Sequence, residues 1–322
     1  SVSGYTLGEV KNYPLKISEQ IEIPNIEDNT PDGIGKQIGA IIQLFTEYYC
    51  NNRPDILIVT GDRYEMFGVG VAACTLQIPM VHLCGGSVTT GAIDDVYRHS
   101  LTKMSQFHFV TCEVYRRRVI QLGESPENVY NVGSLAIENC YNAEKLSEEE
   151  IRKDIGMPQR GKYCVVTYHP VTMEGGHEED EIEALIQALD SFTEYMYIIT
   201  LANVDAGGNK INDLWREAAK EHKNFYVVPS LGVKRYLSAL KYAEMMIGNS
   251  SSGTTEGPAL HIPTVDIGDR QQGRYFAESV VHCDSNKGSI QNAIRYAGSS
   301  EFREKVKQVQ NPFGDLNRWC IY

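Results

Sequence analysis

The segment DILIVTGDRYE, residues 55–65, contains the pattern that decides the fold class. Its first six residues are mostly aliphatic and β-branched, without alternation of polar and apolar side chains, and Pro54 and Gly61 bound them. This composition predicts a short strand that is buried on both faces. Residues 64–76 then have a helical pattern. A buried strand that leads directly into a helix is typical of a parallel sheet covered by helices.

The same alternation of strands and helices continues along nearly the whole chain. In the first half we expect further strands in PMVHLC, FHFVT and VYNVG, and helices over residues 94–105 and 113–122. In the second half the expected strands are YCVVTYH, YMYIITL, FYVVP, EMMIG and IPTVDIG, with helical patterns between most of them. The sequence therefore predicts an α/β fold with two Rossmann-like domains, each built on a parallel sheet.

A polar and charged stretch interrupts this alternation near the middle of the chain. In it, Ser147 and Glu150 match a capping box, and Gly156 followed by Pro158 matches the end of a helix. Two successive α/β domains usually bind a ligand in the cleft between them, at the C-terminal ends of their strands. We predict an N-terminal Rossmann-like domain over residues 1–140, a second one over residues 141–305, and a C-terminal tail or helix over residues 306–322.

The composition is ordinary for a globular protein, since 42% of the 322 residues are hydrophobic and 22% are charged. The net charge of −12 argues against a general role in binding nucleic acid or a membrane surface. No apolar run approaches the roughly 20 residues that span a bilayer. Eight scattered cysteines without a CxxC pair favour reduced thiols in a cytoplasmic protein over disulfides or a zinc site.

Two of the predicted strands end in polar residues that would face the cleft. Asp62 and Arg63 follow DILIVT, and His169 follows YCVVTY. A histidine in such a place can hold a phosphate or a sugar hydroxyl, or transfer a proton near neutral pH. The structural alternatives are that Asp62 caps the next helix and that His169 is a packed side chain bonded to a backbone carbonyl.

The loop GNSSSG, residues 248–253, joins a predicted strand to a helix. Its backbone N–H groups and the hydroxyls of Ser250 and Ser251 would form an anion site at the helix N-terminus. Glu256, about one turn into that helix, can accept hydrogen bonds from both hydroxyls of a ribose. An ordinary helix cap would explain one serine but not three.

Two further loops carry polar residues after a strand. The loop NVDAGG contains Asn203 and Asp205 beside paired glycines, which allow a ligand to approach the backbone closely. The loop GDRQQGR contributes Arg270 and Arg274, whose guanidinium groups suit a diphosphate or a base edge. The alternatives are a plain connection into a helix for the first loop and a surface loop for the second.

The segment HLCGGSVTTGAIDDVYRHS, residues 82–100, concentrates polar groups in few residues. Two glycines and several hydroxyl residues precede the adjacent carboxylates of Asp94 and Asp95. The segment is either a catalytic loop or a well-capped helix start, where an acidic side chain is favourable. No Walker A, GxGxxG or HExxH pattern occurs in the chain.

Together and in this order, these motifs resemble the UDP-N-acetylglucosamine 2-epimerase family. The likeness is greatest to its hydrolysing branch, which begins the synthesis of sialic and legionaminic acids, and it extends over nearly the whole chain. The segments that carry it are GDR, GGSVTTGAIDDVYRHSLTK, HPVTME, NVDAGG, GNSSSG and GDRQQGR, at residues 61–63, 85–103, 169–174, 203–208, 248–253 and 268–274.

The resemblance implies a two-domain fold of the GT-B type, with UDP held mainly by the C-terminal domain. It matches Asp62 and Asp94 to the family's catalytic carboxylates, with Asp95 available for a further acid–base role and His169 beside the phosphates or the sugar. The nucleotide- or substrate-binding residues that we expect are Arg63, Asn203, Asp205, Ser250, Ser251, Glu256, Arg270 and Arg274.

The implied reaction converts UDP-N-acetylglucosamine, or a UDP-diacetamido sugar, to UDP and a free 2-epimer such as N-acetylmannosamine. A base removes the C2 proton, UDP leaves C1, and water adds to the resulting 2-acetamidoglucal. This needs carboxylates of distinct protonation state and donors on the leaving diphosphate, but no cofactor and no metal. The expected partners are the UDP-sugar and UDP, in a cytoplasmic homodimer or homotetramer.

Three alternatives share the same nucleotide site: a non-hydrolysing UDP-N-acetylglucosamine 2-epimerase, a GT-B glycosyltransferase, and a weakly active or inactive UDP-sugar-binding protein. The last arises because the family carries a glutamate in the Gly-Gly stretch, whereas residues 84–87 contain no acid. We also expect the family's first βα unit, with its Gly-Thr-Arg loop, to be absent ahead of SVSGYTLGEV.

Overall fold

The computed structural model describes residues 16–23, 30–89, 93–170, 178–202 and 208–314. The chain divides into two compact units. Unit 1 consists of Ser1–Gly86, Ile93–Phe109 and Arg116–Tyr130, and unit 2 of Ser87–Ala92, Val110–Tyr115 and Asn131–Tyr322. The division into residues 1–140, 141–305 and 306–322 stays a prediction.

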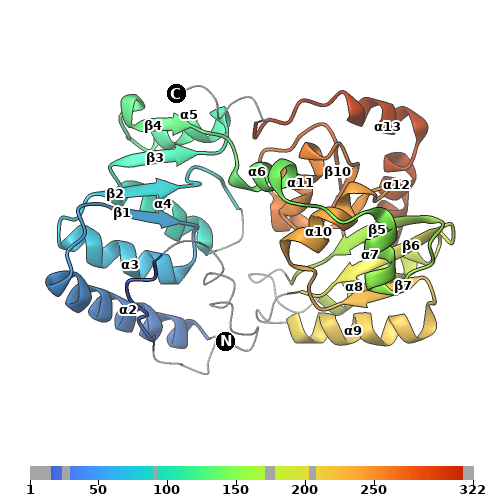
Figure 1. The fold of residues 1–322 in the computed structure, drawn as a ribbon, viewed down its shortest axis with the longest axis horizontal. Helices are drawn as coiled ribbons and strands as arrows, with labels where there is room; N and C mark the ends of the chain where they lie inside the picture. The colour runs from blue at the N-terminus through green and yellow to red at the C-terminus, as the bar shows by residue number, and fades with distance from the viewer. Residues whose placement is uncertain (1–15, 24–29, 90–92, 171–177, 203–207, 315–322) are drawn as a thin grey trace. The chain divides into compact units, whose positions relative to one another are not determined.

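Unit 1 is built on a parallel sheet with helices between its strands (Figure 1). Within the described residues this sheet has four strands in the order β1-β2-β3-β4, and β2 pairs in parallel with both β1 and β3. The elements are α2 (Pro31–Asn51), β1 (Leu57–Thr60), α3 (Tyr64–Thr75), β2 (Met80–Leu83), α4 (Asp94–Met104), β3 (Phe107–Val110), α5 (Glu113–Gln121), η1 (Pro126–Asn128) and β4 (Val129–Asn131).

Unit 2 contains the larger sheet, in which the described strands have the order β10-β9-β8-β5-β6-β7 and every neighbouring pair is parallel. The chain moves outward in one direction from β5 and in the other from β8, so the strand order reverses between these two strands. The strands are β5 (Lys162–Thr167), β6 (Tyr195–Thr200), β7 (Phe225–Val228), β8 (Met246–Gly248), β9 (Thr264–Ile267) and β10 (Val280–Cys283). The helices are α6 (Leu135–Asn142), α7 (Glu148–Ile155), α8 (Glu178–Leu189), α9 (Gly208–Glu221), α10 (Gly232–Lys241), α11 (Ser252–Ala259), η2 (Asp269–Gln271), α12 (Lys287–Ala297) and α13 (Ser300–Lys307).

These elements confirm the α/β fold class and the strands expected from the apolar runs. The expectation that β1 is buried on both faces is wrong, because Val59 is buried while Ile58 is 62% exposed. The inner strands β5, β6, β8 and β9 are buried along most of their length, which explains why they lack polar alternation. The outer strands β7 and β10 are only partly buried. The capping box at Ser147 is formed in full, and Gly156 ends α7 with a φ of +79°, a left-handed conformation that favours glycine.

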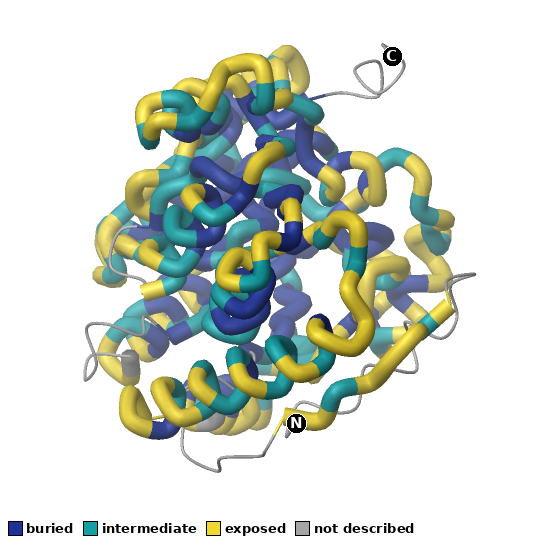
Figure 2. Tube along the Cα trace, turned by 90° about the vertical axis from the view of Figure 1, so that its left-hand side faces the viewer, coloured by how far each residue is buried: buried dark blue, intermediate teal, exposed yellow. Residues whose placement is uncertain are grey.

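Small residues allow α2 and α3 to pack closely in unit 1. A Cβ atom at Gly68 would lie 2.8 Å from the Cγ2 atom of Ile41, and Ala72 is fully buried in the same core. In α2, exposed residues recur at about every third or fourth position between groups of buried and half-buried ones (Figure 2), as expected for a helix with one face toward the core. Unit 1 is stabilised because that face of α2 is buried in one core with the apolar side chain of Met80 on β2.

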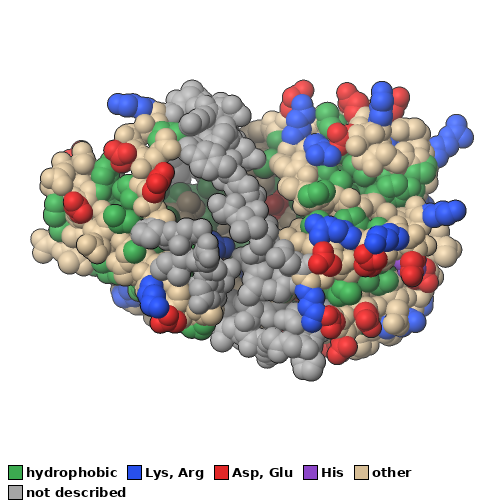
Figure 3. All heavy atoms as spheres, turned by 90° about the horizontal axis from the view of Figure 1, so that it is seen from below, with side chains coloured by type: hydrophobic (Ala, Val, Ile, Leu, Met, Phe, Trp, Pro, Cys, Tyr) green, Lys and Arg blue, Asp and Glu red, His purple; other side chains and the backbone are tan. Residues whose placement is uncertain are grey.

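Charges of both signs mix on the face of unit 2 that Figure 3 displays. In Figure 3 the displayed face of this unit shows Lys and Arg side chains interspersed with Asp and Glu, so no continuous basic surface covers it. In the described part of the chain, no helix is both long and apolar enough to cross a bilayer. The seven cysteines that the structure describes are free thiols.

Gly248, the last residue of β8, allows β8 and β5 to meet at their carboxyl ends. Its φ is +136°, and a Cβ atom there would lie 1.9 Å from the carbonyl oxygen of Thr167. The next residue, Asn249, donates its backbone N–H to that same oxygen at 3.1 Å. Only glycine fits this position, because any side chain would displace the backbone at the point where the strand order reverses.

We predict that Gly248→Ala lowers the free energy of unfolding by about 3 kcal/mol or more, because backbone strain and a steric overlap add. The matched control is Gly35→Ala in α2, where a Cβ atom meets nothing within 4 Å and the helix gains about 0.5–1 kcal/mol. Urea unfolding monitored by circular dichroism measures both. Equal stability of the two variants would contradict this account of Gly248.

His82, on β2, is fully buried and joins three elements of unit 1. Its Nδ1 lies 3.1 Å from the hydroxyl of Thr102 on α4, and its Nε2 lies 3.3 Å from the carbonyl oxygen of Gly61 after β1. Burial lowers the pKa of His82 to about 4, and the Gly61 carbonyl opposes that shift. The imidazole is therefore neutral in the folded protein at neutral pH.

We predict that unit 1 loses stability as the pH falls from about 6.5 to about 4. In this window the unfolded chain takes up a proton on His82 that the folded chain refuses, so His82 contributes a loss of about 3 kcal/mol. His82→Gln removes the titration, and its unfolding midpoint should depend less steeply on pH than that of the wild type. An unchanged pH slope in the variant would show that His82 is not the group responsible.

Candidate active site

Asp62 lies in the loop that connects β1 to α3. The strand ends at Thr60, and Gly61, with a φ of +87°, turns the chain so that Asp62 follows the end of the sheet. The alternative in which Asp62 caps α3 is wrong, because Arg63 occupies the cap position and no side chain caps the helix. Arg63 itself is exposed and donates from its Nε to Glu65.

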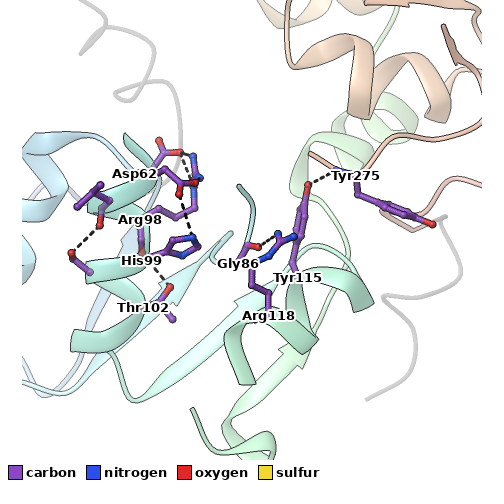
Figure 4. A network of polar contacts seen from close by, with 11 residues as sticks. Asp62, Gly86, Arg98, His99, Thr102, Tyr115, Arg118 and Tyr275 are labelled. Carbon is purple, nitrogen blue, oxygen red and sulfur yellow. Dashed lines mark hydrogen bonds and ion pairs between the residues drawn. The ribbon is translucent and has the colours of Figure 1, made fainter. Parts of the chain in front are cut away.

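The carboxylates of Asp62 and Asp95 share the guanidinium group of Arg98 (Figure 4). Arg98 donates from Nε to Asp62 at 3.0 Å, from Nη2 to the same Asp62 oxygen, and from Nη1 to Asp95 at 2.9 Å. The Arg98 side chain is only 2% exposed, so its charge requires these partners. Planar donors of this kind fix the positions of the carboxylates that they bind.

The helix start predicted at Asp94 is confirmed, since α4 begins there with Asp94 and Asp95 in its first turn. Both negative charges lie at the positive end of the helix dipole. The structure brings Asp95 onto the same guanidinium as Asp62, while Asp94 lies one residue earlier on α4. Asp95 was the additional candidate in the sequence, and here it shares the guanidinium group of Arg98 with Asp62.

Sequence reasoning assigned no role to Arg98 or His99, which complete this cluster. His99 Nε2 lies 3.5 Å from an oxygen of Asp95. A signal for both was present, because residues three and four apart on a helix lie on the same face, and Arg98 and His99 follow Asp95 at those distances. What remained hidden was the contact of Arg98 with Asp62, 36 residues away in the chain.

Cys84 follows β2 in unit 1, where the family resemblance led us to expect an acid. Its φ is +66°, and its backbone N–H donates to Phe109 of β3 at 2.8 Å. Burial raises the pKa of the Cys84 thiol, and the charge of Asp62 adds to that shift. Cys84 therefore keeps its proton at neutral pH and does not supply a further anionic base.

In unit 2 the predicted residues gather around Asn249, at the reversal of strand order between β5 and β8. Asn249 is fully buried. Its side-chain oxygen accepts from the backbone N–H of His169 at 2.7 Å, and its side-chain amide donates to the His169 carbonyl at 2.8 Å. Its own carbonyl accepts from Arg270 at 2.9 Å and from Gln271 at 2.7 Å. Asn249 thus holds the ends of β5, β8 and β9 in register, at the place where open α/β sheets bind ligands.

The serine-rich loop begins α11 without an ordinary side-chain cap. Ser251 is the cap residue and makes no side-chain cap bond, whereas Ser250 accepts from the N–H of Ser252 at 3.3 Å. Further along α11, Thr255 donates to the carboxylate of Glu256. The loop therefore presents hydroxyls and a helix N-terminus together, which is an arrangement that suits a phosphate.

Arg270 and Arg274 are half-buried, whereas Asp269, Gln272 and Gly273 of the same loop are exposed. Burial raises the pKa of Asp266 on β9, and the charges of both arginines oppose that shift. Their guanidinium groups therefore act near the carboxyl end of β9. Asn203 and Asp205 lie outside the described residues, as do the residues of HPVTME after Pro170. Among the residues that the structure describes, no group of three or more His, Cys, Asp and Glu side chains is arranged to hold a metal ion.

Known proteins resemble the chain in sequence and in fold. The family model described as UDP-N-acetylglucosamine 2-epimerase matches residues 4–318. A GDP/UDP-N,N'-diacetylbacillosamine 2-epimerase (hydrolyzing) of Campylobacter jejuni is 36% identical over 94% of this chain and 78% of the relative. The polysialic acid biosynthesis protein P7 of Escherichia coli is 34% identical over 96% of this chain and 79% of the relative.

The structure of the Neisseria meningitidis UDP-GlcNAc 2-epimerase bound to UDP-GlcNAc has a TM-score of 0.73 to this chain. At 18% identity, over 89% of this chain and 80% of that one, this likeness supports the Rossmann-like fold alone. The family model and the two relatives carry the assignment, and they confirm the resemblance seen in the motifs. The chain belongs to the UDP-N-acetylglucosamine 2-epimerase family.

Proposed function

We propose that this chain is a hydrolysing UDP-sugar 2-epimerase. It converts UDP-N-acetylglucosamine or a UDP-diacetamido sugar to UDP and a free 2-epimer such as N-acetylmannosamine. The observation that carries the proposal is the pair of carboxylates, Asp62 and Asp95, on the single guanidinium of Arg98. Removal of a proton from one face of a sugar carbon and its return to the other face require acid–base groups in a fixed arrangement. The name of the Campylobacter relative describes a hydrolysing 2-epimerase.

The reaction proceeds by elimination and then by addition. In the first step a carboxylate takes the C2 proton, the C–H electron pair forms the C1=C2 double bond, and the C1–O bond breaks to release UDP. In the second step water supplies a hydroxyl to C1 and a proton reaches C2 on the opposite face. The sum is UDP-sugar plus water to UDP plus free 2-epimer. We assign the proton transfers to Asp62 and Asp95, with Asp94 as the third carboxylate and Arg98 as the positioning residue.

The leaving diphosphate needs donors that are in place before the bond breaks. In unit 2 we assign this role to the loop at the start of α11 and to Arg270, because Asn249 holds that arginine beside the end of β8. His169, held by the same asparagine, would contact the phosphates or the sugar. Glu256 would accept from the ribose hydroxyls. The other predicted contacts are Arg63, Asn203, Asp205, Ser250, Ser251 and Arg274.

Assembly as a homodimer or homotetramer and a location in the cytoplasm stay predictions from the resemblance alone. Gel filtration with light scattering would decide the first.

We predict that incubation with UDP-N-acetylglucosamine or a UDP-diacetamido sugar in deuterated water releases UDP and a free sugar that carries deuterium at C2. Coupled UDP detection and proton NMR of the sugar measure the two products. Deuterium enters because the proton that reaches C2 in the second step comes from a group that has exchanged with the solvent.

The products also separate this function from its alternatives. A UDP-linked 2-epimer without free sugar would indicate a non-hydrolysing epimerase, and transfer to an added sugar acceptor would indicate a glycosyltransferase. Binding of UDP by calorimetry, with no UDP release from any of these sugars, would indicate a binding protein and overturn the proposal.

We predict that Asp62→Asn lowers kcat by about 100-fold or more, because it removes one acid–base group, while the Kd for UDP changes little. The amide has the size of the carboxylate and can still accept from Arg98. The control is Asp32→Asn, an exposed residue in the first turn of α2, which should leave kcat unchanged. Comparable kcat values for the two variants would show that Asp62 takes no part in proton transfer.

A further inference from the structure

His99 and Arg98 contact different oxygens of the Asp95 carboxylate: the Nη1 of Arg98 binds one, and His99 lies near the other. Arg98 Nη1 donates to Oδ1 of Asp95 at 2.9 Å, whereas His99 Nε2 lies 3.5 Å from Oδ2 (Figure 4). The two donors belong to adjacent residues of α4. Asp95 is therefore held from two sides, strongly by the arginine and loosely by the histidine, since 3.5 Å exceeds the length of a strong hydrogen bond.

The groups that face His99 come from two helices. Asp95 and Arg98 lie on α4, and Arg118 lies on α5, where it also donates to the carbonyl of Gly86 at 2.6 Å. Burial lowers the pKa of His99, Asp95 opposes that shift, and the two arginines add to it. At neutral pH the imidazole is consequently uncharged, and one ring nitrogen carries the proton that it can donate.

The other nitrogen of His99 is also enclosed. Nδ1 is buried and has no hydrogen-bond partner among the described residues, although the side chain as a whole is 24% exposed. A buried nitrogen without an acceptor nearby takes up a proton only at a cost, because the new N–H would have no partner. The neutral form with the proton on Nε2 directs that proton at Asp95.

Protonation of His99 would change how Asp95 is shared between His99 and Arg98. A charged imidazole attracts Asp95 with a full positive charge and competes with Arg98 for the carboxylate. Because Arg98 also binds Asp62, a shift of Asp95 toward His99 alters the separation of the two carboxylates. Displacements of about 1 Å are enough to reduce a rate roughly 100-fold.

We propose that His99 is a positioning residue for Asp95: its neutral imidazole orients the carboxylate toward the reaction, and its protonated form draws the carboxylate away from Arg98. The effect on activity rests on the proposed function, whereas the contact between His99 and Asp95 does not. The two parts are therefore tested separately.

The contact is tested without substrate by NMR titration of the wild-type protein with ¹³C-labelled histidine, with the His99 resonance identified as the one missing in His99→Gln. We expect a His99 pKa below 6.5. It should fall further in Asp95→Asn, which removes an attraction for the proton, and rise in Arg118→Gln, which removes a repulsion. A His99 pKa that does not respond to Asp95→Asn overturns the proposal, whatever the activity of the protein.

The positioning role is tested by replacing His99 with glutamine or asparagine, whose side-chain amides differ in their distance from the backbone. The amide of His99→Gln takes the place of Nε2 and does not titrate, whereas that of His99→Asn takes the place of Nδ1 and falls short of Asp95. We expect the glutamine variant to keep about a third or more of kcat at pH 8 and to lose the acid limb of the wild-type pH profile. We expect the asparagine variant to lose kcat roughly 10-fold to 100-fold with KM little changed.

Each other result counts against the role of His99. Equal kcat values for the two variants, or an acid limb that persists unchanged in His99→Gln, would overturn it. Absence of UDP release from the wild type would refute the proposed function instead, and the NMR titration would still decide whether His99 binds Asp95.

Discussion

The shared guanidinium of Arg98 is the interaction on which the arrangement of unit 1 depends. A buried positive charge has to be neutralised by partners that stay in place, and here the partners come from the loop after β1 and from the first turn of α4. The same constraint that secures the fold also fixes two carboxylates at the end of the sheet. His82 reinforces it, because it joins the loop after β1 to Thr102, one turn beyond Arg98. The local structure and the acid–base chemistry that we propose therefore rest on the same few side chains.

In unit 2 the ends of the strands are also fixed by buried residues, but these are a glycine and the neutral amide of Asn249. Gly248 allows two strands to meet where their order reverses, and the buried Asn249 then bonds the strand ends on either side. Loops at such a reversal can face a ligand without unsatisfied backbone groups. The hydroxyls and the arginine that we assign to the diphosphate lie on this frame, so they need little reorganisation when the leaving group becomes charged.

The fold was largely predictable because its strands are apolar and the inner ones are buried, and because stops such as Gly61 and Gly156 act locally. The capping box at Ser147 is equally local, and it was predicted and formed. Contacts between distant segments were not predictable in this way. No pattern near Asp62 predicts its contact with Arg98, which lies 36 residues later. Asn249 belongs to the GNSSSG motif, but the motif does not predict its hydrogen bond with His169, 80 residues earlier. Sequence patterns identified the polar residues at strand ends, while the side chains that hold them became visible only in three dimensions.

The central claim is that Asp62 and Asp95 act as one unit through Arg98. A double-mutant cycle of UDP release from the sugar nucleotide tests it most directly, with Asp62→Asn, Asp95→Asn and the double variant compared under saturating substrate. Residues that act as a unit are strongly non-additive. The account predicts that the double variant loses about as much kcat as the more impaired single variant. If the two losses multiply instead, the carboxylates act independently, and the account of Arg98 as their common support is wrong.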